Sequence, residues 1–366
     1  MKLQHLTIKG AVLGGIWLLA SCGNAEPNRA QQNKTAYTEF QTTNNANVFV
    51  EPDRLEGDVV RNIDAAKVVR YRVEDAINGV AFLDETMAIA VALNKDVLLL
   101  DGASGDEQFR FEPCRSCSNV HIKRSDDGRE IVMPSRARDG GGAYDLKTGA
   151  KLRDLTGPDY RAAYTPDGSH VLSVLDRQAV IESRDSAAPV WNSGVSDVGA
   201  LGYAPDGSRF VIAADDGDGP LSGGKVLIYN AETRDIETRI DYARATFNHL
   251  AITPDSRRLI LGSYKDRVLV WRLDEQKPHC RFNSDAKGRG LRALKLSPDG
   301  HLIATGGGTN NWGYVRVWDA ETCELRAEVN FKGRVSGLSF HPTRPSLAAG
   351  AWSGELAIVD LEKLLP

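Results

Sequence analysis

The chain has 366 residues, of which 42% are hydrophobic and 26% are charged, and its formal net charge is −4. This is the composition of an ordinary globular domain, and it is long enough to bury a large core. The slightly acidic balance argues against non-specific binding to nucleic acids, whose phosphates attract basic surfaces.

The first 21 residues have the organisation of a secretory signal peptide. Lys2 and Lys9 supply positive charge, and the apolar run over residues 11–19 is too short for a stable transmembrane helix. The adjoining residues Leu19-Ala20-Ser21-Cys22 resemble the lipobox of bacterial lipoproteins, with cleavage before Cys22. The alternative is an ordinary secretory signal followed by a chance cysteine.

Cleavage at the lipobox would leave Cys22 at the N-terminus, with acyl chains on its thiol and amine. Several acyl chains hold a protein firmly in a membrane. Gly23 and Asn24 follow the cysteine. By resemblance to lipoprotein sorting in Gram-negative bacteria, these residues favour the outer membrane, on its periplasmic side. Removal of Lys2 and Lys9 with the signal changes the formal net charge from −4 to −6.

Residues 22–60 are polar and rich in Asn, Gln, Thr and Ala. Such a composition cannot form a hydrophobic core. We interpret this stretch as a lipidated, flexible tether with a mean reach of roughly 35 Å.

The rest of the chain, residues 61–366, repeats one pattern at intervals of roughly 40 to 50 residues. A tight turn of the type Ser-Pro-Asp-Gly precedes two apolar runs, and the second run tends to end in an aromatic residue and Asp. Pro presets φ in such a turn, Asp accepts local hydrogen bonds, and Gly tolerates positive φ. The seven turns begin at Leu83, Ser125, Thr165, Ala204, Thr253, Ser297 and His341.

A repeat of about 40 to 45 residues with four short strands is typical of a β-propeller. Runs such as residues 259–261 and 268–270 are apolar on both faces, as required in a sheet that packs between two neighbouring sheets. Outer strands, such as residues 324–329, are more polar and are expected to face solvent. The sequence therefore predicts one all-β domain, a seven-bladed β-propeller.

The two ends of the repeat region are expected to close the ring together. The last repeat stops soon after residues 356–360 and lacks an outer strand of its own. Residues 67–73 alternate in polarity as a strand does. We expect this N-terminal segment to supply the fourth strand of the last blade, which removes an exposed sheet edge.

These features together resemble the WD-repeat propeller family, over about residues 65–366. The resemblance rests on the turns and on dipeptides at strand ends, namely Trp318-Asp319, Trp271-Arg272, Tyr229-Asn230, Tyr144-Asp145 and Val359-Asp360. The Gly-His pair that precedes the first strand of each repeat in that family is absent. The buried hydrogen-bond network that this His supports in the family is therefore not expected here.

The propeller region contains four cysteines. The spacing of Cys114 and Cys117 favours a local disulfide in an oxidising compartment, with a redox-active pair or a metal site as alternatives. A c-type haem is excluded, because Ser118 rather than His follows the second cysteine. Whether Cys280 and Cys323 pair stays open, since four thiols allow several pairings.

Other candidate chemistry is sparse. His170, His301 and His341 lie at or beside repeat turns and are expected to be solvated. The acidic, Gly-rich run over residues 215–219 offers oxygen ligands of the kind that calcium prefers, but its spacing matches no known calcium loop. No zinc-protease or Gly-x-Ser-x-Gly motif is present. We therefore predict no metal and no cofactor.

One end of the propeller disc is expected to carry the binding site. It bears the turns between second and third strands, and these vary most, as at residues 136–142, 215–224 and 306–313. Tyr264, Trp312 and Trp352 lie three or four residues before the following strand in consecutive blades, so they should form an arc on this end. The alternative is that the two tryptophans fold inward and plug the channel mouth.

Basic residues are expected beside this arc. The connections that lead into blades six and seven carry Arg289, Arg292 and Arg334, together with Lys287 and Lys332. Aromatic residues beside Arg are typical of binding hot spots. These charges could alternatively be ordinary solvated side chains.

The leading hypothesis is a non-catalytic, monomeric, lipid-anchored propeller of the bacterial envelope, which binds a protein or peptide through this arc. The alternative is an enzyme or small-ligand binder of the quinoprotein or lactonase type with its site in the central channel. His249, Asp197, Arg292 and Arg334 are the channel candidates. A redox or metal role for Cys114 and Cys117 is a third hypothesis.

Overall fold

The computed structural model describes most of residues 68–365 and two short N-terminal strands. The described ranges are 41–43, 46–49, 68–83, 85–94, 96–112, 123–124, 130–133, 142–145, 148–154, 162–183, 189–215, 223–242, 246–265, 267–285 and 290–365. The lipobox with Cys22, the pair Cys114 and Cys117, and Arg289 lie outside these residues. The predictions made for them are not tested by the structure.

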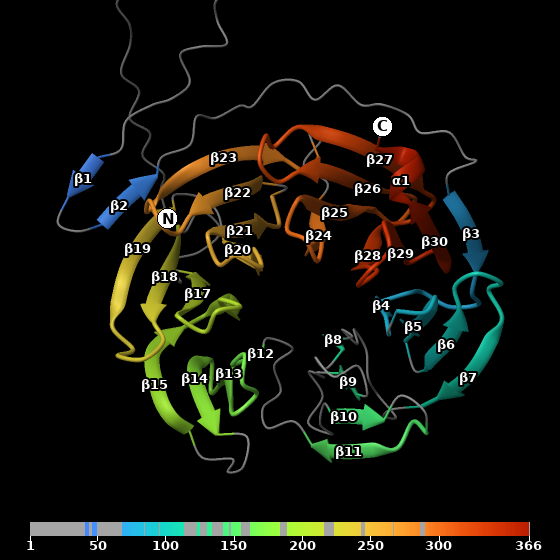
Figure 1. Cartoon of the computed structure of the whole chain (residues 1–366), viewed down its shortest axis with the longest axis horizontal. Helices are drawn as coiled ribbons and strands as arrows, with labels where there is room; N and C mark the ends of the chain where they lie inside the picture. The colour runs from blue at the N-terminus through green and yellow to red at the C-terminus, as the bar shows by residue number, and fades with distance from the viewer. Residues whose placement is uncertain are drawn as a thin grey trace, which may run out of the picture. The chain divides into compact units, whose positions relative to one another are not determined.

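Seven four-stranded antiparallel units follow one another along the described chain, and we number them as blades one to seven (Figure 1). Blades one to three comprise β4 (Gly79–Phe82), β5 (Ala88–Ala92), β6 (Val97–Asp101) and β7 (Glu107–Phe111); β8 (Lys123–Arg124), β9 (Glu130–Met133), β10 (Gly142–Asp145) and β11 (Lys151–Asp154); and β12 (Ala163–Tyr164), β13 (His170–Leu175), β14 (Gln178–Ser183) and β15 (Pro189–Ser196).

Blades four to seven complete the ring. They comprise β16 (Val198–Tyr203), β17 (Arg209–Asp215), β18 (Gly224–Asn230) and β19 (Ile236–Tyr242); β20 (Phe247–Ile252), β21 (Arg258–Ser263), β22 (Arg267–Arg272) and β23 (Lys277–Asn283); β24 (Leu291–Leu296), β25 (Leu302–Thr309), β26 (Trp312–Asp319) and β27 (Leu325–Phe331); and β28 (Val335–Phe340), β29 (Ser346–Ala351), β30 (Glu355–Asp360) and β3 (Val68–Arg72). A short helix, α1 (Leu361–Leu364), follows β30.

The first strand of each blade lies innermost, and these strands contact one another from blade to blade. Contacts join β16 to β20, β20 to β24, β24 to β28, and β28 to β4 (Figure 1). Sheets arranged in this way around a central axis form a β-propeller. The predicted all-β fold with seven blades is confirmed.

The ring is closed by a strand from the N-terminal side of the propeller. β3 pairs antiparallel with β30, with Val68 opposite Val359 and Arg72 opposite Glu355. The hydroxyl of Tyr71 also donates to the carbonyl oxygen of Ala103 in blade one, at 2.9 Å. The predicted closing strand is therefore confirmed.

Two strands occur within the segment that was expected to be an irregular tether. β1 (Gln41–Thr43) and β2 (Ala46–Phe49) form a hairpin, and β2 pairs in parallel with β19 of blade four. The outer edge of a blade presents backbone groups that can pair with a further strand. The structure therefore differs from the expected tether at these two strands.

The outer strand of blade six also differs from the expectation of a solvent-facing strand. Ala327, Glu328 and Val329 on β27 are buried. Glu328 accepts a hydrogen bond from Nε of Arg316 on β26 at 2.5 Å, and Nη1 of Arg316 donates to the carbonyl oxygen of Ser284 at 2.6 Å. Buried charges require such partners. Of the polar residues in this segment, Glu324 and Arg326 are exposed as expected, whereas Glu328 is buried in an ion pair.

Apolar side chains fill the space between neighbouring blades. Val315 and Val317 on β26 pack with residues of blade seven, whereas Trp318 packs toward blade five, where its ring stacks on Phe282 at 4.1 Å. The indole Nε1 of Trp318 donates to the buried hydroxyl of Thr305 at 2.8 Å. The indole of Trp318 therefore has a hydrogen-bond partner, although the Gly-His pair of the WD-repeat family is absent.

The repeated turns use their polar residues as predicted and also interlock between blades. In blade six, the hydroxyl of Ser297 and the backbone N–H of His301 both donate to Oδ1 of Asp299, at 2.5 and 3.0 Å. Gly300 has φ of 76°, and a Cβ there would lie 2.7 Å from Cδ of Pro254 in blade five. Equivalent donors from Thr165 and Ser169 lower the pKa of Asp167 to about 2.

The prediction that His341 is solvated is wrong. Its side chain is buried, and Nε2 donates to the carbonyl oxygen of Thr86 in blade one at 2.7 Å. Nδ1 accepts from the backbone N–H groups of Thr343 and Arg344, at 3.2 and 2.9 Å. The ring also packs edge-on against Phe82. His341 therefore joins the turn of blade seven to that of blade one.

Replacement of His341 by Ala should lower the free energy of unfolding by about 2 to 4 kcal/mol, because it removes a buried ring that packs against Phe82 and bonds three backbone groups. Urea unfolding of the propeller measures this. His301→Ala is the matched control, because His301 follows the corresponding turn of blade six but is exposed, and it should change stability by less than about 0.5 kcal/mol. Equal effects of the two substitutions would contradict the buried role of His341.

Candidate functional site

Tyr264 and Arg292 form the first of two arginine–aromatic pairs. Tyr264 lies in the loop between β21 and β22 and is 48% exposed. Arg292 is the second residue of β24, and its guanidinium carbon lies 5.3 Å from the centroid of the Tyr264 ring. An arginine at this distance from an aromatic face gains a cation–π interaction. His249 of β20 packs edge-on against the same ring at 6.4 Å.

Arg334 and Trp352 form the second pair, in blade seven. Arg334 immediately precedes β28, and Trp352 lies in the loop between β29 and β30 with 37% of its surface exposed. The guanidinium carbon of Arg334 lies 3.0 Å from the centroid of the Trp352 ring. The backbone N–H of Trp352 donates to the carbonyl oxygen of Arg334 at 3.0 Å, which fixes the loop beside the arginine.

The two arginines influence each other and have no acidic partner among the described residues. Burial lowers the pKa of Arg334, and the nearby charge of Arg292 lowers it further. Nε of Arg334 is buried and has no hydrogen-bond partner among the described residues. No carboxylate of the described chain forms an ion pair with either arginine. Two uncompensated positive charges are therefore held close together, which favours the binding of an anion.

Trp312 is less exposed than the other two aromatic residues of the predicted arc. It begins β26 and is half-buried, with its ring tilted against Tyr314 at 5.6 Å. Tyr314 is itself fully buried, and its hydroxyl lies 3.2 Å from that of Ser284. The exposed aromatic surface therefore comes mainly from Tyr264 and Trp352.

The residues proposed for a channel enzyme serve other contacts in the structure. Asp197 forms an ion pair with Arg177, and His249 contacts Tyr264. Within the ranges that the structure describes, no group of three His, Cys, Asp or Glu residues is placed to hold a metal ion. Of the candidate calcium run, Asp215 is described, whereas residues 216–219 lie outside the described chain.

A disulfide that the sequence left open joins blades five and six. Cys280 on β23 is bonded to Cys323, in the turn that follows β26, with a Cα–Cα distance of 6.4 Å. The two cysteines are 43 residues apart, which is close to one repeat. This spacing was the signal in the sequence, because residues one repeat apart lie in neighbouring blades.

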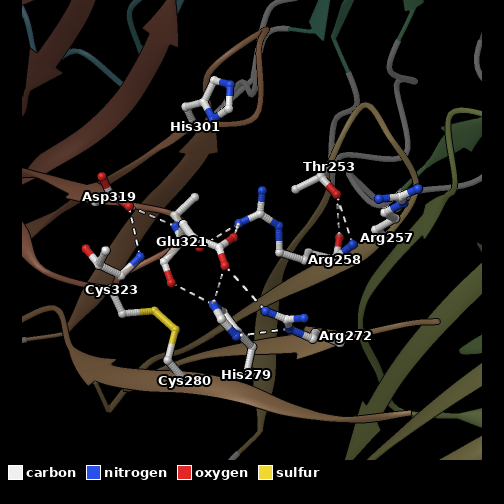
Figure 2. Close-up of polar contacts among 12 residues, drawn as sticks. Thr253, Arg257, Arg258, Arg272, His279, Cys280, His301, Asp319, Glu321 and Cys323 are labelled. Atoms are coloured by element: carbon white, nitrogen blue, oxygen red, sulfur yellow. Dashed lines mark hydrogen bonds and ion pairs between the residues drawn. A yellow bond between two sulfur atoms is a disulfide. The ribbon is translucent and has the colours of Figure 1, made fainter. Parts of the chain in front are cut away.

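Beside the disulfide, several basic groups converge on one carboxylate (Figure 2). Glu321 accepts from Nη1 of Arg258 at 2.8 Å and from Nη2 of Arg272 at 3.3 Å. Nε2 of His279 donates to the carbonyl oxygen of Glu321 at 2.6 Å, and Nδ1 accepts from Arg272 at 3.1 Å. The basic groups of this seam are thus paired, in contrast to Arg292 and Arg334.

No helix in the described part of the chain has the length and apolar character needed to cross a membrane.

Comparisons with known proteins agree with the fold. The family model "WD domain, G-beta repeat" matches residues 278–319, which include β24 to β26 of blade six. The chain is also similar to the solved β-propeller domain of Cps50 (Swd1) from Myceliophteria thermophila, with a TM-score of 0.65 and 16% identity. That likeness covers 79% of this chain and 98% of the solved domain.

Three curated proteins are similar over shorter stretches. Telomerase protein component 1 of Rattus norvegicus is 25% identical over 165 residues, which are 45% of this chain and 6% of that protein. Protein groucho of Drosophila melanogaster is 24% identical over 159 residues, which are 43% of this chain and 20% of that protein. Small ribosomal subunit protein RACK1 of Neurospora crassa is 30% identical over 112 residues, which are 30% of this chain and 33% of that protein. The chain thus spans a third or less of each of these relatives.

Removal of the disulfide by the double substitution Cys280→Ser and Cys323→Ser should destabilise the propeller. The loop-closure entropy of a loop of this length corresponds to about 4 kcal/mol, so a loss of about 2 to 4 kcal/mol is expected. Urea unfolding with and without reductant measures it, and the single variant Cys280→Ser should match the double variant. Unchanged stability in the double variant would contradict the disulfide.

Proposed function

We propose that this WD-repeat-like β-propeller is a non-catalytic interaction scaffold of the bacterial envelope, which binds a protein or peptide through its loop-bearing end. The observation that carries the proposal is the pair of arginine–aromatic contacts, Arg292 with Tyr264 and Arg334 with Trp352. They come from blades five, six and seven and remain partly exposed. Trp312 and Arg289 complete the surface that we assign to the partner.

The residue types and their support favour a protein partner. Trp, Tyr and Arg are the residues most enriched in the energetic hot spots of protein interfaces. In repeat proteins, loops on one face often form the binding surface. Because each loop is held between two paired strands of a closed ring, its position is fixed before the partner arrives, which reduces the entropy lost on binding.

The names of two relatives point in the same direction. One is a protein of the small ribosomal subunit and the other is a protein component of telomerase, so both belong to larger assemblies. A scaffold role for the present chain agrees with these names.

The envelope location rests on the N-terminal sequence and on the disulfide. Disulfides persist in oxidising compartments such as the periplasm, and the bond between Cys280 and Cys323 is of this kind. The lipobox around Cys22 would add a lipid anchor in the same compartment. We propose attachment to the outer membrane, with the propeller in the periplasm, where the anchor raises its local concentration near membrane-bound partners.

A photo-crosslinking side chain in place of Tyr264 should give a discrete protein adduct in cells, because this position is exposed beside Arg292. The control is the same side chain in place of Ser169, in the turn between β12 and β13. Turns between first and second strands lie at the opposite end from turns between second and third strands, so this control samples the other face. Adducts of equal yield at both positions, or none at position 264, would contradict a partner surface.

Replacement of Cys22 by Ser should move the protein from the membrane fraction to the soluble fraction, since the acyl chains could no longer be attached. Cell fractionation followed by detection of the propeller measures this. Cys114→Ser, which leaves the lipobox intact, should stay with the membrane. Retention of the Cys22→Ser variant in the membrane fraction would show that the anchor lies elsewhere.

A further inference from the structure

Lys295 is a third positive charge on the same strand as Arg292, nearer to the turn between β24 and β25, and makes no ion pair within the described chain. It lies on β24, three residues after Arg292, and its side chain remains accessible to solvent. Burial nevertheless lowers its pKa, and no acidic neighbour opposes that shift. The innermost strand of a propeller borders the central channel. A side chain on this strand can therefore be accessible to water and still be surrounded by protein.

The three basic side chains come from adjacent strands. β24 carries Arg292 and Lys295, and β28, which begins directly after Arg334, contacts β24. Leu294 and Leu296 pack toward blade five, so Lys295, which alternates with them, lies on the other face of the strand. Arg292 and Lys295 are separated by about 10 Å along the strand. One carboxylate cannot reach both, but two carboxylates on an extended peptide can.

Other cations of the described chain are paired with carboxylates. Arg316 is paired with Glu328 in the interior of blade six, and Arg258 and Arg272 are paired with Glu321 at the seam with blade five. Among the described residues, no carboxylate forms an ion pair with Arg292, Arg334 or Lys295. The mutual repulsion of Arg292 and Arg334 and the burial of Arg334 carry a cost that an acidic partner would offset.

We propose that the partner contributes an extended acidic peptide segment, whose carboxylates bind Arg334 and Arg292 at the loop-bearing end and Lys295 further along β24. The exposed rings of Tyr264 and Trp352 flank this path and would contact apolar side chains of the segment. The inference deepens the proposed function and rests on it, because it assigns a chemistry to the partner of the same surface.

The test measures binding of a fluorescein-labelled, C-terminally amidated peptide, Ser-Glu-Leu-Glu-Gly-Ser, to the full chain by fluorescence anisotropy. Its two Glu stand two residues apart, so an extended peptide presents both carboxylates on one face. The control peptide replaces both Glu by Gln and keeps the length and the Leu. The acidic peptide should bind at least about tenfold more tightly than the amide peptide, as expected for charge-assisted hydrogen bonds.

Variants assign the binding to individual side chains. Arg292→Gln and Lys295→Met should each weaken binding of the acidic peptide by about tenfold or more. Both positions are accessible to solvent, so neither substitution is expected to prevent folding. Arg257→Gln is the matched control, because Arg257 is an exposed arginine in a turn at the opposite end of the propeller. This variant should bind the acidic peptide with the affinity of the wild type.

Equal affinity for the two peptides, unchanged affinity in Arg292→Gln and Lys295→Met, or no binding of the acidic peptide would each overturn the inference. The proposed function is judged separately by the crosslink at position 264. One informative result is an adduct that keeps its yield when Arg292→Gln and Lys295→Met are added to the crosslinking variant. That result would support the partner surface and overturn the inference that the partner is acidic. If no adduct forms at position 264 in the otherwise wild-type chain, both the proposed function and the acidic-peptide inference are wrong.

Discussion

The pairing of β3 with β30 is the interaction on which the rest of the structure depends. Each blade buries its two faces against its neighbours, so an open ring would expose a face of blade one and a face of blade seven to water. The closing strand comes from the N-terminal side of the propeller and is paired to the last repeat. It therefore links the two ends of the repeat region and fixes the position of every loop relative to the others.

Polar contacts between blades then hold the ring in register. His341 bonds the turn of blade seven to blade one, and Arg316 with Glu328 fills the space toward blade five. The disulfide between Cys280 and Cys323 adds a covalent link at the same seam, between blades five and six. In each of these contacts the buried polar groups find partners. Arg292 and Arg334, in contrast, form no ion pair within the described chain and contact aromatic rings instead.

The sequence predicted those features that depend on local chemistry. The repeated turns predicted the fold and the number of blades, because Pro, Asp and Gly determine the turn wherever it occurs. Alternation predicted the closing strand. The burial of His341 and of Glu328 was missed, because it depends on residues of another blade or strand that no local pattern reveals. The pairing of Cys280 with Cys323 stayed open for the same reason.

The candidate site was predicted in part. The positions of Tyr264, Trp352, Arg292 and Arg334 followed from counting within the repeat, since equivalent positions lie at the same end of each blade. The stacking of each arginine on an aromatic ring could not be predicted, because it depends on the twist between neighbouring strands. Lys295 was overlooked, since a lysine in an otherwise apolar strand has no motif that reveals its exposure.

Native-state hydrogen exchange of the propeller tests ring closure most directly. If β3 is an integral part of the ring, the amides that pair β3 with β30 should exchange only when the whole propeller unfolds. Their protection should then equal that of the central strands of blades four to six. Rapid exchange of these amides by local opening, while the central strands stay protected, would show that the ring does not depend on this strand.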